Sequence, residues 1–261
     1  MTSWAHAVNS RSKFEEAIQS PSVSAIECDV LMCSDHPSEP ILAHPPSRES
    51  DLTVALMLRL ILGPQIYGKG NLRKHLKLDF KEIPALRPTL DLLSNFDFTN
   101  TFHNEIILNA DILSGPGFDN NDPSIVSSSI FLETCLDYIQ QLKMKNSKIL
   151  FAFSLGFKCN WQAKEGYLAT QVSQMTELVH RYQLARSNIG VKVILALNAR
   201  LLGKNLPVFD PFLIEYPEST ILAWTGSGEP SIPRLAIDEI RDYYKSKKME
   251  NRIEFDCCID E

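Results

Sequence analysis

Eight short apolar segments recur along the chain, and this pattern restricts the possible folds more than any other feature. The segments cover residues 3–8, 24–32, 75–81, 105–113, 148–156, 191–199, 220–226 and 252–259. Amphipathic helical patterns follow the first five segments and precede the last, at residues 10–20, 49–62, 84–96, 127–145, 165–185 and 233–248. Strands that alternate with helices predict βα units and a parallel sheet.

The length of the chain favours one architecture of this type. A (β/α)8 barrel takes about 250 residues, and the chain has 261 residues. An open doubly wound sheet is the alternative, but its usual glycine-rich loop, G-x-G-x-x-G, follows none of the strand segments. We therefore predict an α/β fold, a (β/α)8 TIM-type barrel of irregular form, as a single domain over residues 1–261.

Composition excludes several partners. The formal net charge is −6 and the pI is about 5.6, so nucleic acid is not expected, because phosphate binding favours a basic surface. No apolar run approaches the roughly 18 residues of a membrane span. The six cysteines form no C-x-x-C pair and the first residues do not resemble a signal peptide. We expect reduced thiols and a cytoplasmic protein, although a shortened form of a secreted protein would show the same features.

Two carboxylates interrupt the apolar segment at residues 24–32, SAIECDVLM. Glu27 and Asp29 are two residues apart, so they share one face of the predicted strand. Two buried carboxylates repel each other and cost several kcal/mol unless a positive group meets them. The sequence therefore predicts a cation near this face, either a lysine or a metal ion.

The next strand segments carry polar groups that could meet the first two. The polar face of residues 75–81 bears Lys77, Asp79 and Lys81. Polar groups near the carboxyl ends of barrel strands are where such proteins do chemistry. Glu27, Asp29 and Asp79, with the neutral Asn109, would give an all-oxygen site, which suits Mg²⁺ or Ca²⁺ better than zinc. The alternative is a barrel interior of lysine–carboxylate pairs without metal.

Two histidines lie at positions from which they could reach this cluster. His6 belongs to the first strand segment, and His44 follows the second in PILAHPP. A pair of imidazoles beside a metal can act as general base and general acid. A structural role is the alternative for each, and we expect it for the other four histidines: His36, His75, His103 and His180. Neither His6 nor His44 has a histidine two residues away, which disfavours an H-x-H zinc hydrolase.

Eight motifs stand in order along the chain: WAHAVNS, IECDVL, PILAHPP, LKLDFK, LNADILSGPG, FSLGF, EGY and AWTG. Together they resemble the menorin family, whose domain is similar to the phospholipase C-like and glycerophosphodiester phosphodiesterases. The resemblance runs from Trp4 to the last strand segment, so it covers nearly the whole chain. It implies an irregular TIM barrel with phosphodiesterase-like chemistry.

The resemblance also implies roles for individual residues. His6 and His44 match the acid–base pair of the wider phosphodiesterase group. Glu27, Asp29 and Asp79 match the residues that hold a divalent metal ion, Mg²⁺ or Ca²⁺. Lys81 matches a lysine on the third strand, which would stabilise charge on the phosphoryl group.

The sequence departs from the phosphodiesterase pattern in two places. Those enzymes begin with His-Arg-Gly, where the arginine can hold phosphate, whereas His6 is followed here by alanine and valine. Their third acid is usually glutamate, whereas Asp79 is one methylene shorter. We expect Asn109 to take part of the arginine's role, with Arg200 and Trp224 also contacting substrate. A helix-start or solvent role for Arg200 and a barrel-plug role for Trp224 are the alternatives.

These observations predict a metal-dependent phosphodiesterase-like protein that acts on a phosphodiester small molecule or a lipid head group. A catalytically inactive binding or scaffold protein on the same barrel is the alternative, because fold does not fix function. A glycoside hydrolase is disfavoured. Its two carboxylates flank the scissile bond, whereas Glu27 and Asp29 are close enough on one strand to share a metal ion.

Overall fold

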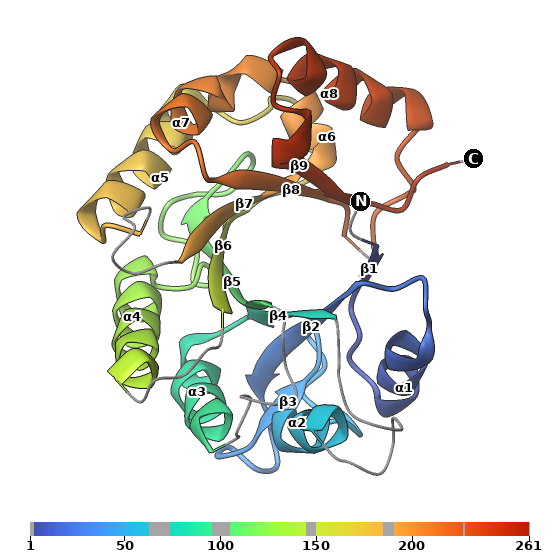
Figure 1. Cartoon of the computed structure of the whole chain (residues 1–261), viewed down its shortest axis with the longest axis vertical. Coiled ribbons are helices and arrows are strands. Elements are labelled where there is room, and N and C mark those ends of the chain that lie inside the picture. The colour runs from blue at the N-terminus through green and yellow to red at the C-terminus, as the bar shows by residue number, and fades with distance from the viewer. Residues whose placement is uncertain are drawn as a thin grey trace. The chain divides into compact units, whose positions relative to one another are not determined.

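The computed structural model describes residues 3–62, 74–95, 105–144, 150–184, 191–226 and 228–260. Strands and helices alternate along these residues (Figure 1). The strands are β1 (Trp4–Ala5), β2 (Ala25–Met32), β3 (Pro40–Leu42), β4 (His75–Phe80), β5 (Glu105–Ser114), β6 (Leu150–Lys158), β7 (Lys192–Asn198), β8 (Thr220–Trp224) and β9 (Ile253–Asp256). The helices are α1 (Arg11–Gln19), α2 (Val54–Leu62), α3 (Leu86–Ser94), α4 (Ser128–Met144), α5 (Ala169–Arg181), α6 (Ala199–Gly203), α7 (Asp210–Glu215) and α8 (Arg234–Ser246), with 3-10 turns η1 (Ile83–Ala85), η2 (Leu206–Phe209) and η3 (Glu250–Arg252).

The strand order confirms the predicted fold class. Apart from β3, the strands follow the chain in the order β1-β2-β4-β5-β6-β7-β8-β9. Neighbours run parallel, as in the pairs β1–β2, β2–β4, β4–β5, β7–β8 and β8–β9. This is the succession of a (β/α)8 TIM-type barrel. The doubly wound alternative is wrong, because such a sheet reverses its strand order at a switch point.

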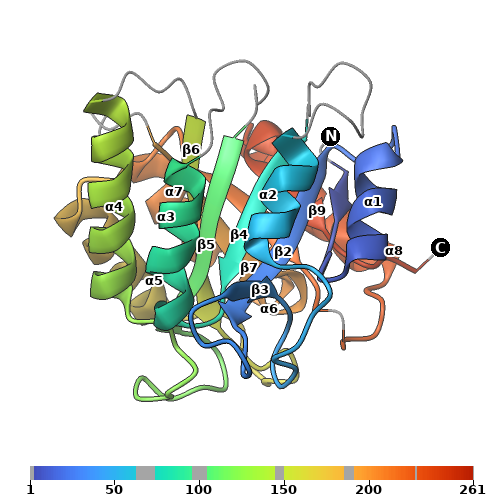
Figure 2. The ribbon, with the colours of Figure 1, turned by 90° about the horizontal axis from the view of Figure 1, so that it is seen from below.

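The chain divides into two compact units, which we describe separately. The N-terminal unit comprises residues 2–110 and 126–152, and the C-terminal unit comprises residues 111–125 and 153–261. The prediction of a single domain stays a prediction. In the N-terminal unit, α1, α2 and α3 lie along one face of β2 and β4 (Figures 1 and 2). The apolar residues of β4 face helices, and Phe80 contacts Phe131 of α4 with ring centroids 6.0 Å apart.

This packing fixes the direction of the polar side chains. Alternate residues of a strand point to opposite faces, so Lys77 and Asp79 lie on the face of β4 away from the helices. The register places Glu27 beside Lys77, and Asp29 beside Asp79. The prediction that the polar faces of the two strands coincide is therefore confirmed.

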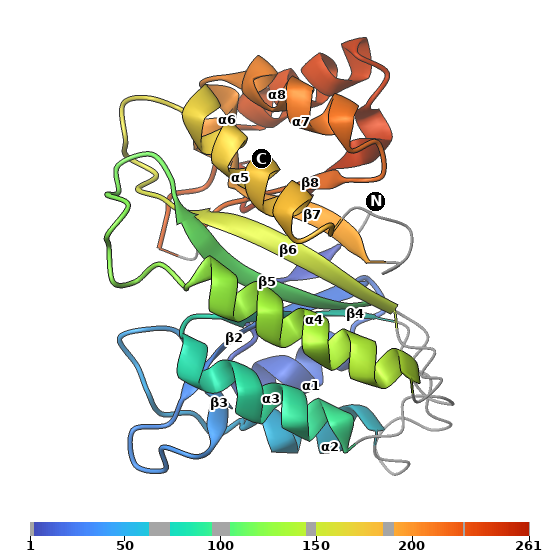
Figure 3. The same cartoon turned by 90° about the vertical axis from the view of Figure 1, so that its left-hand side faces the viewer.

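The C-terminal unit has its own core. Figure 3 shows α5 and the shorter helices beside β7 and β8. Phe157, Tyr167 and Phe209 form an aromatic cluster with centroids 5.4 to 6.4 Å apart. The Tyr167 hydroxyl accepts a hydrogen bond from the backbone N–H of Asn198 at 2.8 Å. The side chain of Asn198 then caps α6 by accepting from the backbone of Arg200 at 3.1 Å.

All eight predicted strands and six predicted helices are present, with shifted ends. Parts of the predicted segments, residues 96, 145, 148–149 and 185, lie outside the described residues. The sequence analysis missed β3 and the short helices α6 and α7. All six cysteines are free. Within the described part of the chain, no helix has the length and apolarity needed to span a membrane.

Candidate metal-binding site

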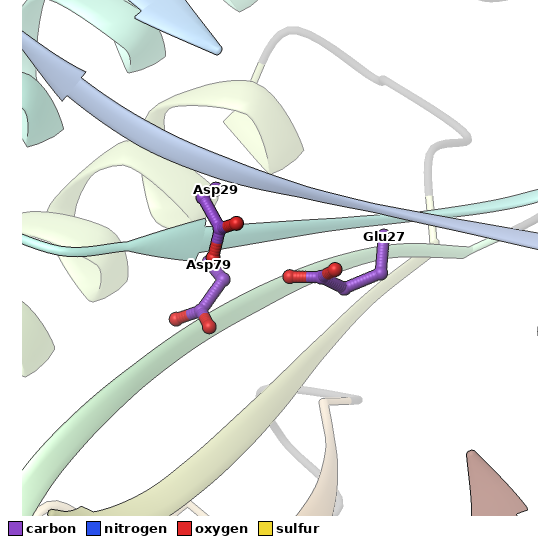
Figure 4. Close-up of side chains that lie close together, drawn as sticks. All are labelled: Glu27, Asp29 and Asp79. Atoms are coloured by element: carbon purple, nitrogen blue, oxygen red, sulfur yellow. The ribbon is translucent and has the colours of Figure 1, made fainter. Parts of the chain in front are cut away.

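Three carboxylates converge in the N-terminal unit. Glu27 and Asp29 come from β2 and Asp79 comes from β4, and each offers an oxygen that lies within 4.8 Å of those of the other two. Figure 4 shows Asp29 and Asp79 next to each other, with the Glu27 carboxylate extending toward them. The predicted metal ligands are therefore brought together. They form the one such acidic group in the described chain.

Lys81 follows β4 and meets two of the carboxylates. Its Nζ donates to Asp79 Oδ2 at 2.6 Å and forms an ion pair with Asp29 Oδ1 at 2.7 Å. The lysine thus supplies the positive charge that two acidic residues on one face require. Its position also matches the predicted role, a fixed positive charge beside the carboxylates.

Two asparagines orient the aspartates. Asn109 of β5 donates its Nδ2 to Asp79 Oδ1 at 2.6 Å. Asn9, after β1, makes two bonds with Asp29: its Nδ2 donates to Oδ2 at 2.6 Å, and its Oδ1 accepts the backbone N–H at 2.9 Å. Asn9 was not predicted from the sequence. Its only sequence signal is that it lies three residues after His6, in the same motif.

The turn that carries Asn9 is itself bonded to β2. Ala7 has a φ of 51°, a left-handed conformation that costs a residue other than glycine about 1–2 kcal/mol. In this conformation the Ala7 N–H donates to Glu27 Oε2 at 2.7 Å, and Val8 N–H donates to the Glu27 carbonyl at 2.9 Å. The turn therefore fixes one oxygen of Glu27 while Asn9 fixes Asp29.

The acidic residues differ in their electrostatics. Burial, together with the neighbouring charge of Asp29, raises the pKa of Glu27 to about 7. Burial also disfavours the charged form of Asp79, but the charges of Lys81 and Lys77 and the bonds from Lys81 and Asn109 outweigh it, so the pKa of Asp79 lies below its ordinary value. A cation in the cluster would have to displace a proton held by Glu27 near neutral pH.

The two candidate acid–base histidines both lie in the N-terminal unit. His6 Nδ1 is 3.8 Å from Glu27 Oε2. His44 follows β3, and the preceding residue, Ala43, donates its N–H to the carbonyl of Asp29 at 3.1 Å. His44 Nδ1 is 2.7 Å from the carbonyl of Pro45. A carbonyl only accepts, so Nδ1 carries the hydrogen and Nε2 is left to exchange a proton.

The chemistry of the donor set fits a hard divalent cation. All candidate ligand atoms are oxygens, which are the ligands that Mg²⁺ and Ca²⁺ prefer. Asn109 Oδ1 is buried and has no hydrogen-bond partner among the described residues, so it is a further neutral oxygen available to a cation. Glu27, Asp29 and Asp79 would hold the ion, and Asn109 could complete the set.

Two predicted substrate contacts, Arg200 and Trp224, lie in the C-terminal unit. Arg200 donates Nη2 to the carbonyls of Pro230 and, at 2.8 Å, Ser231, and its Nε lies 3.4 Å from Glu229 Oε2. These bonds, and its place at the start of α6, agree with the structural alternative. Trp224 is half-buried at the end of β8. Substrate contact by either residue stays a prediction.

The strand order and the acidic cluster define an α/β protein of barrel topology with a candidate metal site. The Menorin N-terminal domain profile matches residues 1–253. The human protein FAM151B is 29% identical in an alignment of 252 positions, and the match covers 94% of this chain and 80% of that protein. No solved structure matches the chain. The chain belongs to the menorin family, which confirms the resemblance at the level of the family.

Proposed function

We propose that the protein is a metal-dependent phosphodiesterase-like protein, related to the phospholipase C-like superfamily, that acts on a phosphodiester small molecule or lipid head group. The observation that supports this most is the convergence of three carboxylates within 4.8 Å, with an imidazole 3.8 Å from one of them. An acid–base group beside an oxygen-ligand cation site is an arrangement that can catalyse phosphoryl transfer.

Each group in the N-terminal unit has a place in this proposal. A divalent ion held by the three carboxylates would polarise a phosphoryl oxygen. One histidine, His6 or His44, takes the proton of the attacking hydroxyl or water, and the other gives a proton to the leaving oxygen. Lys81 stabilises negative charge on the phosphoryl group. Hydrolysis and cyclisation use the same residues, so both reactions belong to the proposal.

A thermal melt in excess EDTA, Mg²⁺, Ca²⁺ or Mn²⁺ tests the metal site. An ion present at 100 times its dissociation constant stabilises by about 2.7 kcal/mol. We expect the metal to raise the midpoint of the wild-type protein and to leave Glu27→Gln unchanged. Glu239→Gln on α8, where the glutamate is exposed, is the control and should respond as the wild type does. A shift that survives in Glu27→Gln would contradict the proposed ligands.

Turnover of phosphodiesters tests the histidines. We expect His6→Ala and His44→Ala each to lose roughly 10²–10⁴-fold of the rate and to keep the midpoint shift with metal. His180→Ala removes an exposed imidazole on α5 and should keep full activity. Near-normal turnover in either of the first two variants would rule out the assigned acid–base pair.

One observation favours the second candidate, an inactive binding or scaffold protein. Lys81 already pairs with Asp29 and Asp79 at 2.7 and 2.6 Å, so a large part of the acidic charge is balanced without a metal ion. A protein that shows no metal shift and turns over no phosphodiester would support this candidate. Lys81 would then be the cation that the sequence of β2 requires.

A further inference from the structure

Three lysines in and around β4 differ in how their ammonium groups are satisfied. Lys74 donates to the backbone carbonyls of Ser20, at 2.6 Å, and Val23. Lys81 bonds two carboxylates of the candidate site. Lys77 is only 3% exposed, yet no oxygen of the described residues accepts a hydrogen bond from it or pairs with it. Its Nζ lies 5.9 Å from the centroid of the Trp4 ring, and its charge acts to lower the pKa of both Glu27 and Asp79.

An acidic partner is next to Lys77 but is turned elsewhere. Glu27 is the register partner of Lys77 in the neighbouring strand. Its Oε2 instead accepts the N–H of Ala7 at 2.7 Å and lies 3.8 Å from His6. The carboxylates of Glu27 and Asp79 balance the charge of Lys77 electrostatically, without a direct bond to its ammonium. The hydrogen-bonding capacity of this ammonium is therefore left unused by the described residues.

A second donor lies near Lys77. Trp4 Nε1 is buried and has no hydrogen-bond partner among the described residues. An ammonium and an indole N–H are both donors with no acceptor capacity. Two neighbouring donors suit a ligand whose oxygens accept hydrogen bonds, and the oxygens of an anion do so.

We propose that Lys77 and the indole N–H of Trp4 bind the anionic group of a ligand, a phosphate or sulfate, beside the three carboxylates. This inference deepens the proposed function, on which its link to a substrate rests. The three carboxylates carry three negative charges, and Lys77 and Lys81 carry two positive ones. A bound divalent ion would therefore leave a net positive charge, which favours an anion. Charge-assisted bonds from Lys77 then supply part of the affinity.

Binding of two probes tests the assignment. Thermal melts with increasing sodium sulfate, or with glycerophosphocholine, are compared with sodium chloride at the same ionic strength, each with EDTA and with Mg²⁺. We expect at least one probe to raise the wild-type midpoint beyond chloride. Sulfate also stabilises proteins in general by exclusion from their surface, so only a response that is lost in Lys77→Met is assigned to this site. A sulfate response of that kind assigns a site for free anions, and such a response to the diester alone assigns a substrate contact.

Variants identify the groups responsible. Lys77→Met should weaken the probe's affinity by about tenfold or more, and Trp4→Phe should weaken it less, while both keep the Mg²⁺ shift. Lys74→Met, the matched buried control, should lower the midpoint and keep the probe response. If Lys77→Met does not fold, Lys77→Gln replaces it. No probe response in the wild type, or an unchanged response without Lys77, overturns the proposal.

The same melts separate this inference from the proposed function. A probe response that depends on Lys77, in a protein without any Mg²⁺ shift, leaves the anion site standing and removes the metal-dependent reaction. A Mg²⁺ shift that depends on Glu27, with no response to either probe, leaves the metal site standing and removes the anion site.

Discussion

At the scale of single residues, the environment of each carboxylate decides its charge. Glu27 is buried among other acids and its pKa is raised to about 7. Lys81 and Asn109 bond Asp79, and its pKa is lowered despite burial. The two effects act on stability in different pH ranges, so they can be measured separately.

The raised pKa of Glu27 predicts that the metal-free protein loses stability as pH rises. The ordinary pKa is 4.5 and the folded value is about 7. Between these values the folded protein keeps a proton that the unfolded chain has lost, so stability falls with rising pH, by roughly 3 kcal/mol in all. Urea unfolding in EDTA at several pH values measures this loss. It should be largely absent from Glu27→Gln, and an equal slope in that variant would contradict the assignment.

Asn9 is predicted to position Asp29 for metal. Asn9→Ala leaves the N–H and one oxygen of Asp29 without their partner, which costs about 1–3 kcal/mol. Loss of a residue that orients a ligand typically weakens metal binding about 10–100-fold. Calorimetric titration with Mn²⁺ measures the affinity. Asn251→Ala, which removes an exposed asparagine, is the control, and an unchanged affinity in Asn9→Ala would exclude this role.

At the scale of elements, β3 and its loop place His44. The strand pairs antiparallel with β2 through Val30 and Leu42, which turns the chain back toward Asp29. Arg48 then holds the loop in place. Its guanidinium donates hydrogen bonds to the Glu82 carboxylate at 2.6 and 3.0 Å and to the carbonyl of Met32 at 3.3 Å. The bond from Arg48 is the main cause of the lowered pKa of Glu82.

Arg48→Ala is expected to loosen the loop that carries His44. The pair with Glu82 is partly exposed, so we expect a loss of about 1 kcal/mol or less. Turnover of a phosphodiester should fall while the Mg²⁺ shift stays, because the carboxylates lie on β2 and β4. Faster cleavage of residues 33–53 by a protease would show the loosening. Arg87→Ala breaks the exposed pair with Asp91 and should change neither property.

At the scale of the whole molecule, the two units are interleaved in the sequence. The N-terminal unit ends at residue 110 and resumes at residue 126, and both β5 and β6 contribute residues to each unit. Because two strands continue from one unit into the other, we expect the two units to unfold together. A single domain remains a prediction that an unfolding experiment would test.

Tryptophan fluorescence can test this coupling. Trp4 lies in the N-terminal unit, and Trp161 and Trp224 lie in the C-terminal unit. One variant keeps Trp4 alone, and a second keeps Trp161 alone, with phenylalanine at the other positions. We expect each variant's fluorescence transition in urea to coincide with its own transition in far-ultraviolet circular dichroism. Fluorescence that changes well before or after the dichroism would show that the units unfold independently.

The sequence by itself determined the class of fold and the faces of the strands. The periods of 2 and 3.6 residues are local, so the eight strands, the six longer helices and the grouping of Glu27, Asp29 and Asp79 could be predicted. The strand β3 was missed because three residues carry too little pattern. The menorin resemblance likewise rests on motifs that are visible in the sequence.

Only the tertiary structure decided how these side chains are paired. The left-handed turn at Ala7 sets the two bonds of Asn9 to Asp29 and the direction of the Glu27 carboxylate. It is also tertiary packing that places Lys77 beside Trp4 without a direct hydrogen-bond acceptor among the described residues. Hydrogen bonds between residues 20 to 50 positions apart depend on where the strands meet in space. The spacing of residues along one strand gives no information about these long-range pairings.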